Sequence, residues 1–146
     1  MRRRGSAIVL LLLCSVACSL PATTFDAYRA KAADAAREVV SQARTAILVS
    51  RLDGGDRLLS SAVTVQLRDA EKTAATAVAA FASVRPPDAR ADHLRARLLP
   101  LLDRASDAIT RMRFEATRDD TAALLRSRSS LVEPADALER WADSVA

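Results

Sequence analysis

The fold is decided by residues 88–118, which read DARADHLRARLLPLLDRASDAITRMRFEATR. Apolar side chains recur along this stretch at spacings of three and four residues, for example at Ala91, Leu98 and Met112. Such spacing places them on one side of an α-helix. Asp88 stands directly before the pattern, where a side chain that caps the helix N-terminus is expected. The stretch therefore predicts one long amphipathic helix.

Three further segments show the same apolar spacing, one after this stretch and two before it. Strong turn signals separate the four segments at residues 53–56, 85–88 and 118–120, and each signal ends in an aspartate suited to cap the next helix. Thr24 is suited to cap the first. The sequence therefore predicts helix starts at Thr24, Asp56, Asp88 and Asp120.

Equal helices joined by short turns must run antiparallel to their neighbours in sequence. Each segment of about 28 residues would be about 42 Å long at 1.5 Å per residue. We therefore predict an all-α fold, an up-down-up-down four-helix bundle over residues 24–146. The predicted core positions carry the apolar spacing in the four segments: Phe25, Tyr28, Ala32, Ala36, Val39, Ala43, Ile47; Leu59, Val63, Leu67, Ala70, Ala74, Ala77, Phe81, Val84; Ala91, Leu94, Leu98, Leu101, Ala105, Ala108, Met112, Ala116; Leu131, Ala135, Leu138, Trp141 and Val145.

Two prolines, Pro100 and Pro134, lie inside the helical patterns. Each removes a backbone hydrogen bond and clashes with the preceding turn, so kinks are expected near both. Matched kinks would open a pocket between the third and fourth helices. The alternative, which we prefer, is a bundle that absorbs them by curving.

The antiparallel arrangement also gives the bundle two unlike ends. Aromatic and large apolar residues should gather where the chain enters: Phe25, Tyr28, Phe81, Leu94 and Trp141. They would either sit at a membrane interface or, as we prefer, plug the end of the core. The far end should hold another apolar group: Ile47, Leu52, Leu58, Ile109, Phe114, Leu124 and Leu125.

The first 22 residues have the layout of a secretory signal. Arginines at 2–4 precede an apolar run at 7–16, and small residues follow it. Val16-Ala17-Cys18 resembles the lipobox of bacterial lipoproteins, in which the cysteine becomes lipid-modified and is the mature N-terminus; Ser15 departs from the leucine common at its position. The resemblance implies a lipid anchor at Cys18, a signal peptide over residues 1–17 and a tether over 18–23.

Two other interpretations of this segment stay open. Plain cleavage after Ala17 would give a secreted, soluble protein. An uncleaved anchor is disfavoured because residues 5–22 contain serines, end near a proline and barely reach the ~20 apolar residues that span a bilayer. We expect export to the outer face of the cell membrane, with the membrane itself as one partner.

The charge balance changes once the signal is removed. The whole chain has 22 basic and 18 acidic residues, but three arginines lie in residues 1–17. The mature chain is therefore nearly neutral, which argues against nucleic-acid binding. It would keep Cys18 as its one cysteine, so no internal disulfide is expected.

Catalytic and metal-binding patterns are not found in the sequence. His93 is the sole histidine, so a histidine-based metal cluster is not expected. Asp103 and Asp107 are one helical turn apart, but Arg104 and Arg111 flank them, which is typical of a solvated, charged helix face. We therefore predict a non-enzymatic protein without catalytic residues, metal or cofactor.

One charge pattern is regular: Arg90, Arg97, Arg104, Arg111 and Arg118 recur every seven residues. We call these five residues the arginine stripe. With Ala91, Leu98, Ala105 and Met112 at the a positions of a heptad, the stripe occupies the g positions beside the core. The stripe would either contact an anionic partner or, as we prefer, pair with acids of the fourth helix, which are Glu133, Asp136, Glu139 and Asp143.

These patterns together favour an exported, lipid-anchored helical bundle that acts as an interaction or scaffold module of the cell envelope. An envelope protein or an anionic polymer would be its further partner. The alternative is a small-ligand binding or sensing domain that uses a kinked bundle interior near Pro100 and Pro134.

Overall fold

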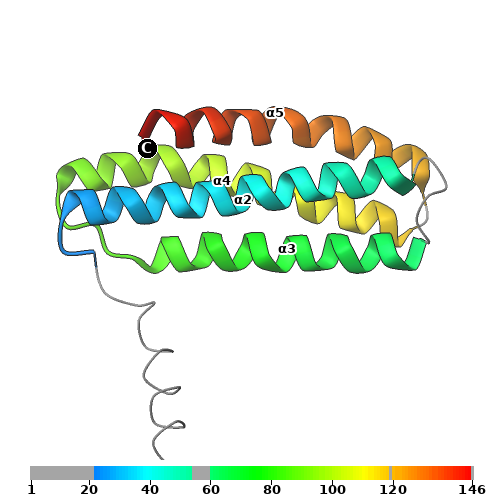
Figure 1. The fold of residues 1–146 in the computed structure, drawn as a ribbon, viewed down its shortest axis with the longest axis horizontal. Coiled ribbons are helices and arrows are strands. Elements are labelled where there is room, and N and C mark those ends of the chain that lie inside the picture. The colour runs from blue at the N-terminus through cyan, green and yellow to red at the C-terminus, as the bar shows by residue number, and fades with distance from the viewer. Residues whose placement is uncertain (1–21, 54–59, 119, 146) are drawn as a thin grey trace, which may run out of the picture.

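The computed structural model describes residues 22–53, 60–118 and 120–145. These ranges contain four helices and no strand: α2 (Phe25–Asp53), α3 (Ser60–Ser83), α4 (Ala89–Thr117) and α5 (Thr121–Val145). Figure 1 shows them as one elongated bundle in which α2 and α4 run one way and α3 and α5 return. The predicted all-α, up-down-up-down four-helix bundle is confirmed.

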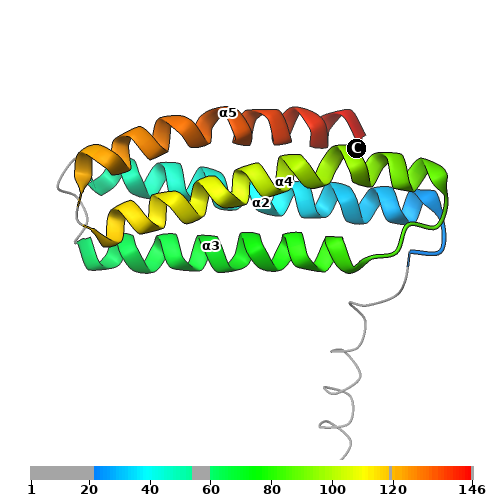
Figure 2. The same cartoon turned by 180° about the vertical axis from the view of Figure 1, so that it is seen from behind.

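The bundle is flattened rather than square. Helix α2 packs against α3, α4 and α5, whereas α3 and α5 do not approach each other within the described ranges. Helices α2 and α4 thus lie across the short diagonal, and one of them fronts each broad side, α2 in Figure 1 and α4 in Figure 2. Alanines make this close approach possible, because the inward face of α2 presents Ala32, Ala36, Ala43 and Ala46, all fully buried.

Capping side chains begin three of the helices where the sequence predicts. Thr24 Oγ1, Asp88 Oδ1 and Asp120 Oδ1 each accept a hydrogen bond from the backbone N–H three residues later, at 3.2, 2.9 and 2.8 Å. Each bond satisfies one of the N–H groups that the first helical turn leaves unpaired. The fourth predicted cap, Asp56, lies outside the described residues.

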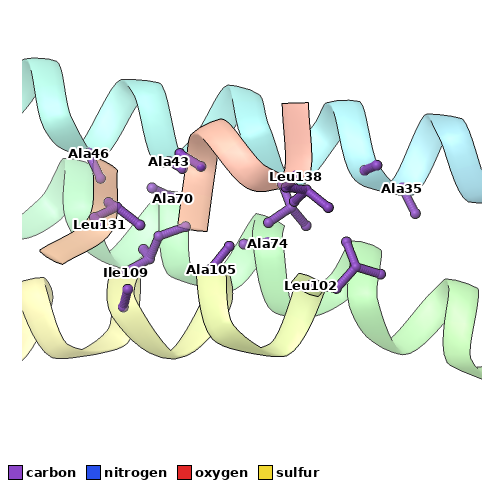
Figure 3. Close-up of a cluster of buried hydrophobic side chains, with 14 of the residues drawn as sticks. Ala35, Ala43, Ala46, Ala70, Ala74, Leu102, Ala105, Ile109, Leu131 and Leu138 are labelled. Atoms are coloured by element: carbon purple, nitrogen blue, oxygen red, sulfur yellow. The ribbon is translucent and has the colours of Figure 1, made fainter. Parts of the chain in front are cut away.

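The core follows the predicted apolar faces and extends beyond them. The four a-position residues of the third segment, Ala91, Leu98, Ala105 and Met112, are fully buried. Two other buried side chains of α4, Leu102 and Ile109, were not in the predicted core. Figure 3 shows them with Leu131 and Leu138 of α5 among the alanines of α2 and α3, so large side chains fill the space that small ones leave.

Both internal prolines lie inside unbroken helices. Pro100 is exposed within α4, and Pro134 is partly buried within α5. In Figures 1 and 2, α5 curves over the bundle along its length. The helices therefore continue past the lost hydrogen bonds, and curvature of this kind is how bundles commonly absorb prolines.

The end at which the chain enters the bundle is closed by buried aromatic residues. Tyr28, Phe81 and Trp141 are all buried, and the ring centroids of Tyr28 and Phe81 are 5.4 Å apart. The Tyr28 hydroxyl makes no hydrogen bond with the described residues. These residues plug the core rather than face a membrane. Ala22, predicted to be tether, is also buried in this cluster, so the packed domain begins before Thr24.

The far end carries the predicted apolar group, but only part of that group is buried. Ile47, Ile109 and Leu124 are buried there, but Phe114 is 50% exposed and Leu125 is 36% exposed. Leu58 lies outside the described residues. Phe114 and Leu125 thus lie at the predicted end of the bundle but outside its buried core.

Candidate interaction surface on α4

The position of the arginine stripe on α4 follows from the residues of α4 that contact α3. Arg113 Nε lies 2.5 Å from Glu71 Oε2 of α3, an ion pair rather than an aligned hydrogen bond. Arg95 donates to the carbonyl oxygens of Ala82 and Val84 at 2.6 and 2.9 Å. These two arginines mark the α3 side of α4. At 100° per residue, the arginine stripe lies on the other side, toward α5 and solvent.

The stripe turns gradually away from α5. Seven residues at 100° each fall 20° short of two full turns, so each arginine is rotated by about that angle from the one before it. Arg90 is consequently beside the α5 flank, and Arg118 is on the outer surface of α4. All five side chains are exposed.

The predicted pairing between the stripe and α5 is wrong. Asp136 Oδ1 lies 2.8 Å from the Arg44 guanidinium of α2, and Glu139 pairs with the same group. Within the described ranges, no ion pair joins the stripe to α5. Asp136 and Glu139 occupy the α2 side of α5, whereas the stripe approaches from the α4 side.

These two ion pairs also change the Arg44 guanidinium. Its hydrogen bonds to Glu139 and Asp136 raise its pKa above the ordinary arginine value, because both favour the charged form. The charges of Glu139 and Asp136 are thus shared with a cation of α2 and are not available to α4.

The five stripe residues have few partners of their own. Arg90 lies 4.5 Å above the centre of the Phe25 ring and 3.3 Å from the carboxylate of Asp88. Arg104 donates from Nε to the Pro100 carbonyl oxygen at 3.2 Å and pairs with no acid of the described ranges. The side chains of the other three, Arg97, Arg111 and Arg118, form no ion pair or hydrogen bond with any described residue.

Helix α5 extends this cationic region. Arg126 and Arg140 are exposed and lie, by helical periodicity, on the outer side of α5 away from its Arg44 contact. We define the cationic face as the arginine stripe together with Arg126 and Arg140. Four acids share this side, Asp103, Asp107, Glu115 and Glu133, against seven arginines, so positive charge predominates. Nothing in the heptad pattern points to Arg126 or Arg140, because they belong to the face only through packing.

A metal centre is not found among the described residues. His93 is exposed, and the described ranges contain no group of three His, Cys, Asp or Glu residues that could hold a metal ion. An open groove of about 470 Å³ lies between α2 and α3, lined by residues that include Glu38, Lys72 and Thr76. It is on different helices from Pro100 and Pro134 and does not correspond to the predicted proline pocket.

The residues predicted to direct the protein to a membrane lie outside the described part of the chain. Cys18, the predicted lipid attachment site, is among them. Within the described ranges, no helix has an apolar stretch long enough to cross a membrane. Comparisons with protein-family models, curated proteins and solved structures find no match for this chain. The cationic face is therefore assigned as the candidate site from its exposed arginines alone.

Proposed function

We propose that this protein is an exported, non-enzymatic interaction module of the cell envelope, anchored by lipid at Cys18. Its bundle presents the cationic face to an anionic partner. One observation carries the proposal: among the described residues, Arg97, Arg104 and Arg111 have no acidic partner. Two arginines that lie between helices, in contrast, form ion pairs. Arg44 and Arg113 each pair with acids of a neighbouring helix.

The packing of the interior supports an interaction at the surface. The bundle centre is filled by alanines from three helices and by leucines of α4 and α5, as Figure 3 shows. Small side chains draw the helices together, and the larger ones occupy the remaining space. Binding through exposed charges requires no opening of such a core.

The anchor is tested by two matched cysteine substitutions in the full chain, produced in a bacterial host. Cys18→Ala should release the protein from the membrane fraction or block its processing, because the acylated residue is lost. Cys14→Ala removes the other cysteine and should change neither. The measurement is membrane fractionation, with mass spectrometry of the mature N-terminus. A Cys18→Ala protein that is trimmed normally and stays in the membrane would contradict lipid anchoring.

A further inference from the structure

We infer that the cationic face binds the anionic headgroups of a phospholipid bilayer, with the bundle lying along the membrane and Phe114 at the interface. This inference deepens the proposed function, since it names the partner of the same surface. It rests on three features, which are the surroundings of Phe114, the contrast with α2, and the position of the chain entry.

Phe114 is an apolar ring within a positively charged surface. It is half exposed on the outer side of α4, between Arg111 one turn before it and Arg118 one turn after it. The guanidinium carbon of Arg113, whose charge is paired with Glu71, lies 4.1 Å from its ring centre, so the uncompensated charges beside the ring are those of Arg111 and Arg118. A helix side with arginines around an aromatic ring is suited to the boundary between headgroups and acyl chains, where the charges meet phosphates and the ring leaves water.

Helix α2 provides a contrast on the opposite broad side of the bundle. Leu48 is 56% exposed and also lies between two arginines, Arg44 and Arg51. Here Arg44 is neutralised by two acids, whereas no acid of the described chain pairs with Arg111 or Arg118. Exposed apolar area is thus present on both sides. On the α4 side both flanking arginines lack an acidic partner among the described residues, whereas on the α2 side only Arg51 does, because Arg44 is paired with two acids.

The chain enters the bundle at the end where α4 begins (Figure 1). Ala22 is buried there, and it is the fourth residue after Cys18 in the sequence. At most about 14 Å can therefore lie between the lipid attachment site and the packed domain. Arg90 is at this end, and Phe114 is near the other end of a stripe about 42 Å long. Anchor and ring would hold the two ends of the same helix to one surface.

A bilayer fits these features better than a soluble anionic polymer. Both would supply negative charge along the arginine stripe. Only the bilayer also supplies an apolar layer for Phe114, whose exposure to water is unfavourable by the ordinary hydrophobic effect. The partner we assign is therefore an anionic lipid surface.

The test places a tryptophan at each of the two contrasting positions. Full chains with Phe114→Trp or Leu48→Trp are reconstituted in vesicles of equal parts phosphatidylglycerol and phosphatidylcholine that carry brominated acyl chains. Native Trp141 is buried and gives the baseline in the parent chain. We expect the tryptophan at position 114 to be quenched and its emission shifted to the blue, and the one at position 48 to be unaffected. Pure phosphatidylcholine or high salt should abolish the quenching, because the headgroup attraction is absent or screened.

Two pairs of charge changes then test the face itself. Arg97→Gln with Arg104→Gln should abolish quenching at position 114. Arg29→Gln with Arg37→Gln, which removes equal charge from α2, should leave it unchanged. Circular dichroism should show the same helicity in all variants, since the altered side chains are exposed. If helicity falls in the Phe114→Trp chain, a fluorophore on Ser130→Cys of α5, in a chain that also carries Cys14→Ser, replaces it as the probe.

Equal quenching at positions 114 and 48, or none at position 114 in anionic vesicles, would overturn the inference. It would also be overturned if soluble polyphosphate shifted the emission at position 114 as strongly as anionic vesicles do, since the partner would then be a polymer. The fractionation of the Cys18→Ala chain tests anchoring alone, and the quenching difference tests the face alone. The two proposals can therefore fail separately.

Discussion

The two flanks of α5 use charge in opposite ways. Toward α2, Asp136 and Glu139 converge on one cation, Arg44. Toward α4, no ion pair joins the arginine stripe to an acid of α5 within the described ranges. The same helix thus closes one seam with ion pairs and leaves the other positively charged. Charges at heptad positions beside a core can therefore serve either packing or an outside partner, and the helix flank they face decides which.

Neither seam is the main source of stability. The Arg44 pairs are between two-fifths and one-half exposed, and exposed ion pairs contribute only about 0–1 kcal/mol. The buried core beneath both seams contributes far more, because each large apolar side chain is worth several times that amount. Substitutions in the core should therefore have the largest effect on the free energy of unfolding. Substitutions in the seams should have smaller effects that distinguish the α2–α5 seam from the α4–α5 seam.

The largest effect is expected in the shared core. Leu98→Ala in α4 and Leu138→Ala in α5 should each reduce the free energy of unfolding by about 2–5 kcal/mol, because both side chains are fully buried. Leu125→Ala is the control, since Leu125 is 36% exposed at the bundle end and should cost much less. Chemical denaturation followed by circular dichroism measures all three. A similar cost at Leu125 and Leu98 would contradict the described core.

A smaller effect should distinguish the two seams directly. Arg44→Glu should destabilise the domain by at most about 1–2 kcal/mol, since it removes two exposed pairs and adds a like charge. Arg97→Glu should leave the free energy of unfolding nearly unchanged. Adding Glu139→Arg should restore part of the loss in the Arg44→Glu chain and none in the Arg97→Glu chain. Coupling of Glu139 to Arg97 instead would reverse the assignment of the flanks.

The smallest effect concerns the start of α4, the helix that carries the stripe. The hydrogen bond from the Ala91 N–H lowers the pKa of the Asp88 carboxyl, and the contact with Arg90 lowers it further. Because this pKa is lower in the folded chain, the stabilising contribution is complete above the unfolded value of about 3.9 and is lost as pH falls through the folded value.

The corresponding substitution is Asp88→Asn, which keeps a capping oxygen without a titrating group. Melting temperatures measured from neutral pH to about pH 3 should fall less steeply for this variant than for the parent chain. Asp88→Ala should lower the melting temperature at neutral pH as well, because the cap itself is lost. Equal acid sensitivity of the Asp88→Asn and parent chains would show that this carboxyl does not contribute.

The sequence by itself determined the elements and their inward faces. The starts at Thr24, Asp88 and Asp120 follow from caps that bond to N–H groups three residues away, and the burial of Leu98 and Leu138 follows from apolar spacing. Both are local properties, because a helix repeats every 3.6 residues whatever surrounds it. The antiparallel order also follows, since the connecting turns are too short for any other.

Only the tertiary structure decided which flanks meet. Arg44 and Glu139 are 95 residues apart, and no local pattern relates them. The apolar period defines the inward side of each helix but not which neighbour lies to its left or right. Asp136 and Glu139 were therefore expected to meet α4 and instead pair with Arg44 of α2. The exposure of Phe114 and the place of Arg126 and Arg140 beside the stripe depend on that same arrangement. The cationic face is therefore a product of how the helices turn around one another, which a period of 3.6 residues does not encode.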